Sequence, residues 1–539
     1  MIEAFWIPLL PPYLVGLGLS WAIEALLTPR PVAPWRRPGA AVAVHVGVWT
    51  LAFALELALF RRPYFAVANV LAIELLIVLV SNAKFQALRE PFVYPDFEYF
   101  VDAIKHPRLY LPFFGMWRAV AAGSGYGGAL WAGLTLEESL TASAIWVITL
   151  ADLGRESVSN FDLSMTQFFA HTLIFGVTGL WCAYFLASRL SVSFNAAEDL
   201  QKNGIVASLW AYAQCERVPI HKPFPSSLFD GSLGSVPRLT VLPIVLPDMV
   251  VIQSESFFDA RRAFPSIRKN LLENFDLLIS ESSKHGELTV AAWGANTVRS
   301  EFAFLSGIDS AMLGIHQFNP YRKLALEGVS TIATYLRAQG YRTVCLHPYH
   351  RSFYGREKVL PHLGFDEFVA LEAFQDSDRD GPYTSDKAVG KKLLQLLSNH
   401  SERPIFLHVI TMENHGPLHM ESATDEDIQT VMATEVPCNC DDLVVYGRHL
   451  RNTDQMLGEL RQKLIGRDRP TSLCFFGDHV PIMPKVYQSL GEPKGTTEYF
   501  LWHSKQPSNG SAEAADLSTL AFKFLMSSGW THPSALKQP

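Results

Sequence analysis

The sequence predicts an α/β protein in two parts, a helical membrane domain followed by a domain built on a mostly parallel sheet flanked by helices. Apolar residues crowd the first 190 positions in long runs that carry almost no charge. Beyond Leu246, short apolar runs alternate with amphipathic stretches. This alternation is typical of strands that are buried on both faces between helices. A chain of 539 residues is long enough for both parts.

The first part contains four clean membrane-span candidates. A bilayer core about 30 Å thick is crossed by about 20 helical residues. Runs of this kind are Phe5 to Leu27, Ala40 to Phe60, Tyr64 to Val80 and Thr166 to Leu186. The second and third runs exclude a chain whose only apolar segment is a cleaved signal peptide.

Two further segments are less regular. Gly115 to Leu134 is rich in Gly and Ala but contains Arg118, and Leu140 to Leu150 is too short unless it extends back through Glu137 and Glu138. We expect five spans, with six as the alternative. The first loop carries Arg30, Arg36 and Arg37 and the second Arg61 and Arg62, so loop charge does not decide the orientation.

A connector follows the spans. Asn195 to Arg217 has apolar residues at helical spacing, and a series of prolines and glycines from Pro219 to Pro237 then interrupts regular structure. We expect a juxtamembrane helix and an extended linker. The predicted domains are therefore residues 1–190 for the membrane part, 191–245 for the connector and 246–539 for the α/β part.

The α/β part is predicted from its strands and helices. The expected strands are Met249 to Gln253, Leu288 to Ala292, Thr343 to His347, Ile405 to Thr411, Ser472 to Gly477 and Tyr499 to Trp502. The expected helices are Ile267 to Lys284, Val329 to Gln339, Ser385 to Asn399, Asp442 to Leu464 and Ala515 to Met526.

Polar side chains stand where several of these strands end. Glu255, His347, His415 and the pair Asp478 and His479 all lie at or just beyond the carboxyl ends of predicted strands. Sheets of this type place their sites at that edge. The competing interpretation is that polar residues simply resume where strands stop, which explains one such residue better than the whole set.

Four side chains suggest a metal site. Glu255, Asp478 and His479 offer carboxylate and imidazole ligands, and Thr297 lies in a third loop. A divalent cation accepts such ligands, and a threonine hydroxyl beside it loses its proton more readily. We therefore expect Thr297 to be a nucleophile that attacks phosphorus.

The overall charge of the chain argues against nucleic acid as a binding partner. The formal net charge is -7 and the pI is about 6.2, so the chain has no basic balance that would favour nucleic acid. We expect no nucleic-acid partner.

The segment from about residue 246 to 504 resembles the sulfatase-like catalytic domain of lipoteichoic acid synthases and related phosphoglycerol transferases, in the alkaline phosphatase superfamily. The resemblance rests on ordered motifs. These are Ile-Gln-Ser-Glu255-Ser, Thr297-x-x-Ser-Glu-Phe302, Phe353-Tyr-Gly-Arg356 with Leu363-Gly-Phe-Asp366, Glu413-Asn-His415-Gly-Pro417 and Phe476-Gly-Asp-His479.

The resemblance implies roles for these residues. Glu255, Thr297, Asp478 and His479 would hold one divalent metal, most often Mn2+, with Mg2+ or Zn2+ as alternatives. Substrate would be bound by Arg356, Tyr354, His347 and His415, and the two histidines would also act in catalysis. The alternatives are an ion pair of Arg356 with Asp366 or Glu357, and histidines that are bonded to backbone in the core.

The chain departs from the family pattern at three places. Ala295 and Asn296 stand where the family usually has a Gly-rich sequence in the nucleophile loop. His350 adds a second imidazole after His347, and Tyr354 stands where many members have Trp. Acceptor specificity could differ accordingly.

The implied function is transfer of phosphoglycerol, or a similar phosphoryl head group, from a phospholipid such as phosphatidylglycerol to a glycan or polymer acceptor. The family places such enzymes in the cytoplasmic (inner) membrane, multi-pass, with the catalytic domain facing the periplasm or exterior. The alternatives are a phosphoethanolamine transferase, a sulfatase-like hydrolase, and a catalytically silent membrane sensor or assembly factor. No formylglycine frame surrounds Thr297, which disfavours a sulfatase, and no metal ligand is missing, which disfavours the silent protein.

Overall fold

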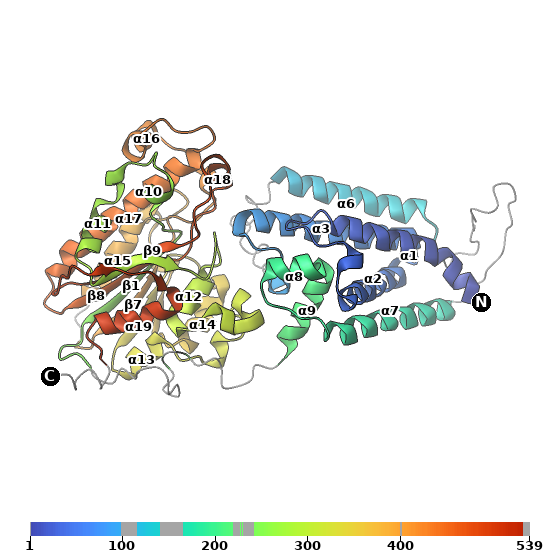
Figure 1. Ribbon diagram of the computed structural model, residues 1–539, viewed down its shortest axis with the longest axis horizontal. Helices are drawn as coiled ribbons and strands as arrows, with labels where there is room; N and C mark the ends of the chain where they lie inside the picture. Colours follow the sequence, from blue (N-terminus) through green and yellow to red (C-terminus); the bar gives the residue numbers. More distant parts are fainter. Residues whose placement is uncertain are drawn as a thin grey trace. The chain divides into compact units, whose positions relative to one another are not determined.

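The computed structural model describes residues 2–98, 116–140, 165–218, 227, 229, 242–398 and 402–531. It divides into two compact units, Met1–Pro219 and Ile220–Pro539 (Figure 1). Each unit is treated by itself below.

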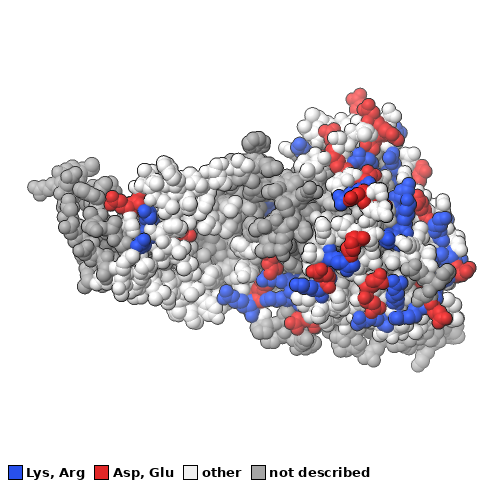
Figure 2. Space-filling view, turned by 180° about the vertical axis from the view of Figure 1, so that it is seen from behind, with Lys and Arg blue, Asp and Glu red and all other residues white. Residues whose placement is uncertain are grey.

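Unit 1 is a bundle of long apolar helices. They are α1 (Ile2–Glu24), α2 (Gly39–Phe60), α3 (Pro63–Leu88), α6 (Met116–Leu136) and α7 (Met165–Ala187). Among the described residues, four stretches are long and apolar enough to cross a membrane: Trp6–Glu24, Gly39–Phe60, Pro63–Leu88 and Met165–Ala187. The visible face of this bundle is almost free of charged residues, whereas both signs of charge cover unit 2 (Figure 2). These helices anchor the chain in a membrane.

A fifth and a sixth span remain predictions. Of the two less regular segments, Gly115 to Leu134 is helical from Met116 onward, as α6, but α6 is not among the four spans just named. Residues 141–150 of the other segment lie outside the described part of the chain.

Small residues allow two helices of the bundle to pack closely together. A Cβ at Gly47 of α2 would stand 2.7 Å from the carbonyl oxygen of Gly179 in α7, so only glycine allows this approach of the two backbones. The ends of these helices then meet the connector. Ala41, Val44 and Ala187 form one buried cluster with Ala207.

The first part of the connector belongs to unit 1. The predicted juxtamembrane helix is two helices, α8 (Ala196–Asn203) and α9 (Ile205–Arg217), because Gly204 has a positive φ of 82° and interrupts the helical path. Both helices lie at one end of the bundle (Figure 1).

Unit 2 is built on a nine-stranded sheet of order β10-β2-β9-β8-β1-β7-β3-β4, with β11 also paired to β2. The strands are β1 (Asp248–Ser254), β2 (Lys284–Thr289), β3 (Arg342–Leu346), β4 (Glu367–Val369), β7 (Ile405–Ile410), β8 (Thr471–Gly477), β9 (Thr497–His503), β10 (Ser511–Ala512) and β11 (Ala515–Asp516). Strands β8, β1, β7, β3 and β4 are parallel, and β9 is antiparallel to both β8 and β2. The predicted mostly parallel sheet is confirmed, with a mixed edge.

Helices cover both faces of this sheet (Figure 1). Alternate residues of β1 enter different cores, Val250 and Ile252 on one face and Met249 and Val251 on the other. The first core is covered by α11 (Glu273–Ser280), α15 (Asp386–Ser398) and α17 (Asp441–Ile465). The second is covered by α12 (Thr297–Ser306), α13 (Ile332–Ala338), α14 (Arg356–His362) and α19 (Leu517–Ser527).

Two predicted elements differ most from the structure in their bounds. The strand expected at Leu288 to Ala292 is β2, which ends at Thr289 and begins at Lys284 because Lys284 pairs with Leu501 of β9. The helix expected from Ile267 to Lys284 is limited to α11, because the chain at Ser283 already donates a backbone hydrogen bond to Leu501 of the sheet.

Candidate metal centre and active site

Two adjacent parallel strands bring the first ligands together. In the register of β1 and β8, Ser254 lies opposite Gly477, so the next residues, Glu255 and Asp478, leave the sheet side by side. The close approach requires glycine at 477, because a Cβ there would meet the carbonyl oxygen of Phe257 at 1.8 Å. The local sequence therefore fixes the backbone that carries the carboxylates.

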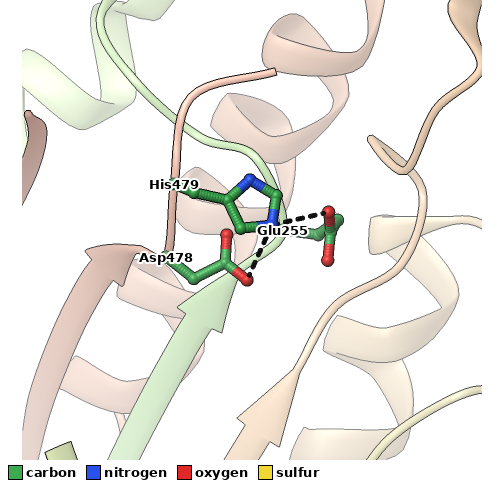
Figure 3. Close-up of side chains that lie close together, drawn as sticks. All are labelled: Glu255, Asp478 and His479. Carbon is green, nitrogen blue, oxygen red and sulfur yellow. Dashed lines mark ion pairs between the residues drawn. The ribbon is translucent and has the colours of Figure 1, made fainter. Parts of the chain in front are cut away.

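Glu255, Asp478 and His479 point toward one another (Figure 3). Their ligand atoms all lie within 4.8 Å of one another, and all three residues are buried. His479 Nε2 is 3.5 Å from Glu255 Oε1 and 3.6 Å from Asp478 Oδ2. This is the only such cluster of acidic, His and Cys side chains in the described part of the chain.

The donor set fits a divalent cation. Asp478 Oδ2 and His479 Nε2 are buried and have no hydrogen-bond partner among the described residues. His479 Nδ1 lies 3.1 Å from the carbonyl oxygen of Val480, a contact that leaves Nε2 as the ligand nitrogen. Burial raises the pKa of Asp478 to about 7, with Glu255 adding to the effect and His479 opposing it. A cation would offset that cost.

Thr297 lies at the start of a helix beside this cluster. It is the first residue of α12, after Asn296 in the left-handed conformation with φ 68°. Its Oγ1 donates a hydrogen bond of 3.3 Å to Glu255 Oε2. A helix N-terminus favours negative charge, such as a phosphate on this hydroxyl. The structure thus brings all four predicted ligands to one place.

Ser256 holds the cluster together, and no role was predicted for it. Its Oγ donates to Glu255 Oε1 at 2.9 Å and lies 3.3 Å from His479 Nδ1, and its backbone N–H donates to Asp478 Oδ1 at 2.9 Å. Its φ of 52° is a left-handed conformation that few non-glycine residues adopt. The only signal in the sequence was its place directly after a ligand.

Arg356 is a buried residue that forms an ion pair, but with neither of the acids considered from the sequence. Its Nη2 donates to Glu301 Oε2 at 2.9 Å, and both side chains are at most 1% exposed. Its Nη1 is buried without a partner among the described residues. Burial would lower the pKa of Arg356, but Glu301 raises it above the ordinary value. Because Glu301 is on α12, the pair fixes Arg356 to the helix of Thr297.

The remaining predicted substrate residues lie at the neighbouring strand ends. His347 is buried with Nδ1 3.2 Å from the carbonyl oxygen of Ile410, while Nε2 has no partner among the described residues. Burial and Arg356 hold its pKa well below the ordinary value, so the imidazole is neutral. His415 is half-buried, and its Nδ1 lies 3.3 Å from the Tyr383 hydroxyl. The guanidinium carbon of Arg356 lies over the ring of Tyr354, 5.3 Å from the ring centre.

A buried carboxyl pair stands behind His415. Glu413 Oε2 accepts the Asp386 backbone N–H at 2.6 Å, and Asp386 Oδ2 accepts from Thr453 at 2.6 Å. Burial raises the pKa of Asp386 to about 6 and, together with Asp386, that of Glu413 to about 8. The pair was not predicted, because Asp386 and Glu413 are 27 positions apart in the chain.

The comparisons agree with this geometry. The model of the Sulfatase family matches residues 247–523, just over half of the chain, so the chain belongs to the sulfatase family. Over part of its length it is similar to lipoteichoic acid synthases. With its long apolar helices, the protein is a membrane-anchored member of that family.

Individual relatives cover different shares of the chain. The capsular polysaccharide biosynthesis protein RkpI of Rhizobium meliloti (strain 1021) is 25% identical over 478 residues, 84% of this chain and 80% of that protein. Lipoteichoic acid synthase 1 of Bacillus subtilis (strain 168) is 25% identical over 166 residues, 29% of this chain and 24% of its own length. The lipooligosaccharide phosphoethanolamine transferase EptA from Neisseria meningitidis has the same fold over 96% of this chain and 94% of its own, with a TM-score of 0.55 and 13% identity.

Proposed function

We propose that this protein transfers glycerol phosphate, or a similar phosphoryl head group, from a membrane phospholipid to an extracytoplasmic glycan or polymer. Phosphatidylglycerol is the proposed donor. One observation carries the proposal: the hydroxyl of Thr297 stands at a helix N-terminus and donates to Glu255, within a set of side chains suited to a divalent cation.

Glu255, Thr297, Asp478 and His479 would hold the cation, for which Mn2+ is proposed. When bound, it would offset negative charge on the phosphate and acidify the threonine hydroxyl. Glu255 already accepts the hydrogen bond of that hydroxyl and is where its proton first goes.

The transfer has two displacements. Thr297 Oγ1 attacks phosphorus, the bond between phosphorus and the diacylglycerol oxygen breaks, and a phosphothreonine forms. His415 gives a proton to the departing oxygen. In the second step the acceptor hydroxyl attacks phosphorus, His415 takes the acceptor's proton, and Thr297 leaves and recovers its own.

Two cationic or polar features favour a phosphate here. Arg356 has a buried Nη1 without a partner in the described part of the chain. The backbone N–H groups of the first turn of α12 lie at the end of that helix that begins with Thr297. His347, kept neutral, is suited to hydrogen-bond the head group without adding charge. A relative named for capsular polysaccharide biosynthesis supports a glycan acceptor.

Phosphoethanolamine is the second candidate head group, because the likeness to EptA extends over both units. The full-length protein in vesicles with either phosphatidylglycerol or phosphatidylethanolamine distinguishes the two. We expect diacylglycerol release from phosphatidylglycerol that stops with a chelator and returns with Mn2+. Release from phosphatidylethanolamine alone would replace the head group, and release from neither donor would refute the proposed function.

A further inference from the structure

A groove in unit 1 lies outside the active site and has no role in the mechanism above. It has a volume of about 770 Å³ and runs along the surface where α2 and α7 pack against each other, next to the first loop. Its walls are apolar or small side chains such as Val46, Gly47 and Phe175, and its one charged residue is Arg37. The groove therefore combines a long apolar channel with a cation at one end.

The length of the groove suits a hydrocarbon chain. On α2 it extends from Gly39 to Thr50, and 11 residue steps of a helix span about 16 Å. That distance reaches from the edge of a bilayer leaflet to about its centre. Trp35, which is 83% exposed, lies at the same end as Arg37 and suits the aromatic belt at the membrane surface.

Arg37 is held in place at that end. Its Nη1 pairs with the buried Glu24, and its Nε donates to the carbonyl oxygen of Val32 at 2.9 Å. The contacts just named involve its Nε and Nη1, and the side chain, which is 3% exposed, lines the groove. A guanidinium fixed in this way offers N–H donors to a phosphate without further ordering.

The end that carries Arg37 is also the end from which the chain leaves for the catalytic domain. Val32 of the first loop donates to the carbonyl oxygen of Gln201 in α8, and Glu24 accepts from Val206 at the start of α9. Residues that follow α9 lead into unit 2. The head of the groove therefore lies at the leaflet that borders the end of the bundle from which the chain continues into unit 2.

We propose that this groove binds a glycerophospholipid of that leaflet, with one acyl chain lying along the line where α2 and α7 meet and its phosphate at Arg37. This site would hold the donor lipid of the proposed transfer reaction. That role of the bound lipid rests on the proposed function. Lipid binding is measured without turnover, so the binding site and the transferase activity can fail separately.

The first test measures retained lipid. The full-length protein is incubated in detergent with equal amounts of phosphatidylglycerol, phosphatidylethanolamine and diacylglycerol, washed, and analysed by native mass spectrometry. We expect a retained glycerophospholipid and little diacylglycerol. No retained lipid, or diacylglycerol retained equally well, would overturn the proposal.

Two tryptophan variants of α2 locate the site. Ala43→Trp fills the groove, whereas Leu55→Trp adds the same side chain at a position that is 59% exposed and outside the groove. We expect most of the retained phospholipid to be lost in Ala43→Trp and kept in Leu55→Trp. Equal retention in both variants contradicts the assignment.

A lipid with a photoreactive group at the end of its acyl chain gives a second measurement on the unaltered protein. It should label residues near Thr50 and Phe175, at the deep end of the groove. Labelling spread evenly over the exposed faces of the helices would overturn the proposal, and this readout decides the matter if Ala43→Trp does not fold.

Discussion

Ser256 is the residue on which the geometry of the metal ligands depends most directly, although it is not itself a ligand. It contacts Glu255 and His479 through its hydroxyl and Asp478 through its backbone. Groups that orient ligands in this way affect metal affinity even though they do not touch the ion.

We expect Ser256→Ala to weaken Mn2+ binding by about 10- to 100-fold, because Glu255 and His479 lose the hydroxyl between them. Calorimetric titration of the full-length protein measures this. Saturating Mn2+ should restore most of the turnover. The control is Ser280→Ala, whose exposed hydroxyl bonds only the carbonyl oxygen of Leu277. Equal Mn2+ affinity in all three proteins would exclude a positioning role for Ser256.

The residues of the site differ in how far the sequence predicts them. Glu255, Asp478 and His479 could be found because they are the first or second residue after an apolar strand. The ion pair of Arg356 with Glu301 could not, because nearer acids at 357 and 366 offered equally good partners in the sequence. Glu301 is selected by the fold, which places α12 and α14 on the same face of the sheet.

At the scale of elements, the end of β8 sets the spacing of the site. Gly477 approaches the backbone of Phe257 so closely that no side chain fits. Neither backbone can move without displacing Asp478, which follows directly.

We expect Gly477→Ala to destabilise unit 2 by about 1–3 kcal/mol and to abolish Mn2+ binding. Thermal unfolding and metal titration measure the two effects. Gly466→Ala is the matched control, since a Cβ there would meet its nearest neighbour, the carbonyl oxygen of Lys463, at 3.6 Å. Unchanged metal binding in Gly477→Ala would show that the strand end does not set the site.

Asp386 at the start of α15 and Glu413 just beyond the end of β7 are buried carboxyl groups that bind protons more tightly than in an unfolded chain. Their pKa values are raised to about 6 and about 8, above the values near 4 of an unfolded chain. Between these limits the folded protein binds more protons than the unfolded one, so stability falls as pH rises.

In chelator, the free energy of unfolding of unit 2 should therefore decrease between about pH 4 and about pH 8, by about 1.4 kcal/mol per pH unit for each extra proton. Asp386→Asn should reduce this slope. Denaturant unfolding across the pH range measures it. Stability that rises with pH in chelator would contradict the assigned burial of these acids.

The elements also show what the sequence can predict. Strands β1, β7 and β8 were predicted to within one residue at each end, because they are apolar throughout and lie in the middle of the sheet. Strand β2 was displaced, since it is only partly buried and its position depends on pairing with β9. The short β4 was missed, because three residues carry too little pattern.

At the scale of the whole molecule, the chain forms two units with separate cores, and the first unit ends at Pro219. The metal ligands all belong to the second unit. A ligand that binds one folded unit stabilises that unit alone.

We expect two thermal transitions for the full-length protein in detergent, of which Mn2+ raises only the one that belongs to unit 2. At 100 times the dissociation constant the added stability is about 2.7 kcal/mol. Scanning calorimetry with and without chelator measures this added stability. The control is a Glu255→Gln variant, whose unfolding is followed by intrinsic tryptophan fluorescence. A single transition, or a shift of both, would show that the units unfold together.

The nucleophilic role of Thr297 is tested most directly by intact-protein and peptide mass spectrometry of the full-length protein mixed with Mn2+ and phosphatidylglycerol, without acceptor. We predict a phosphoglycerol adduct on Thr297 that disappears when acceptor is added, and that is absent, with turnover lowered at least about 10³-fold, in a folded Thr297→Ala variant. Turnover that persists in Thr297→Ala, or an adduct on a different residue, would contradict the account.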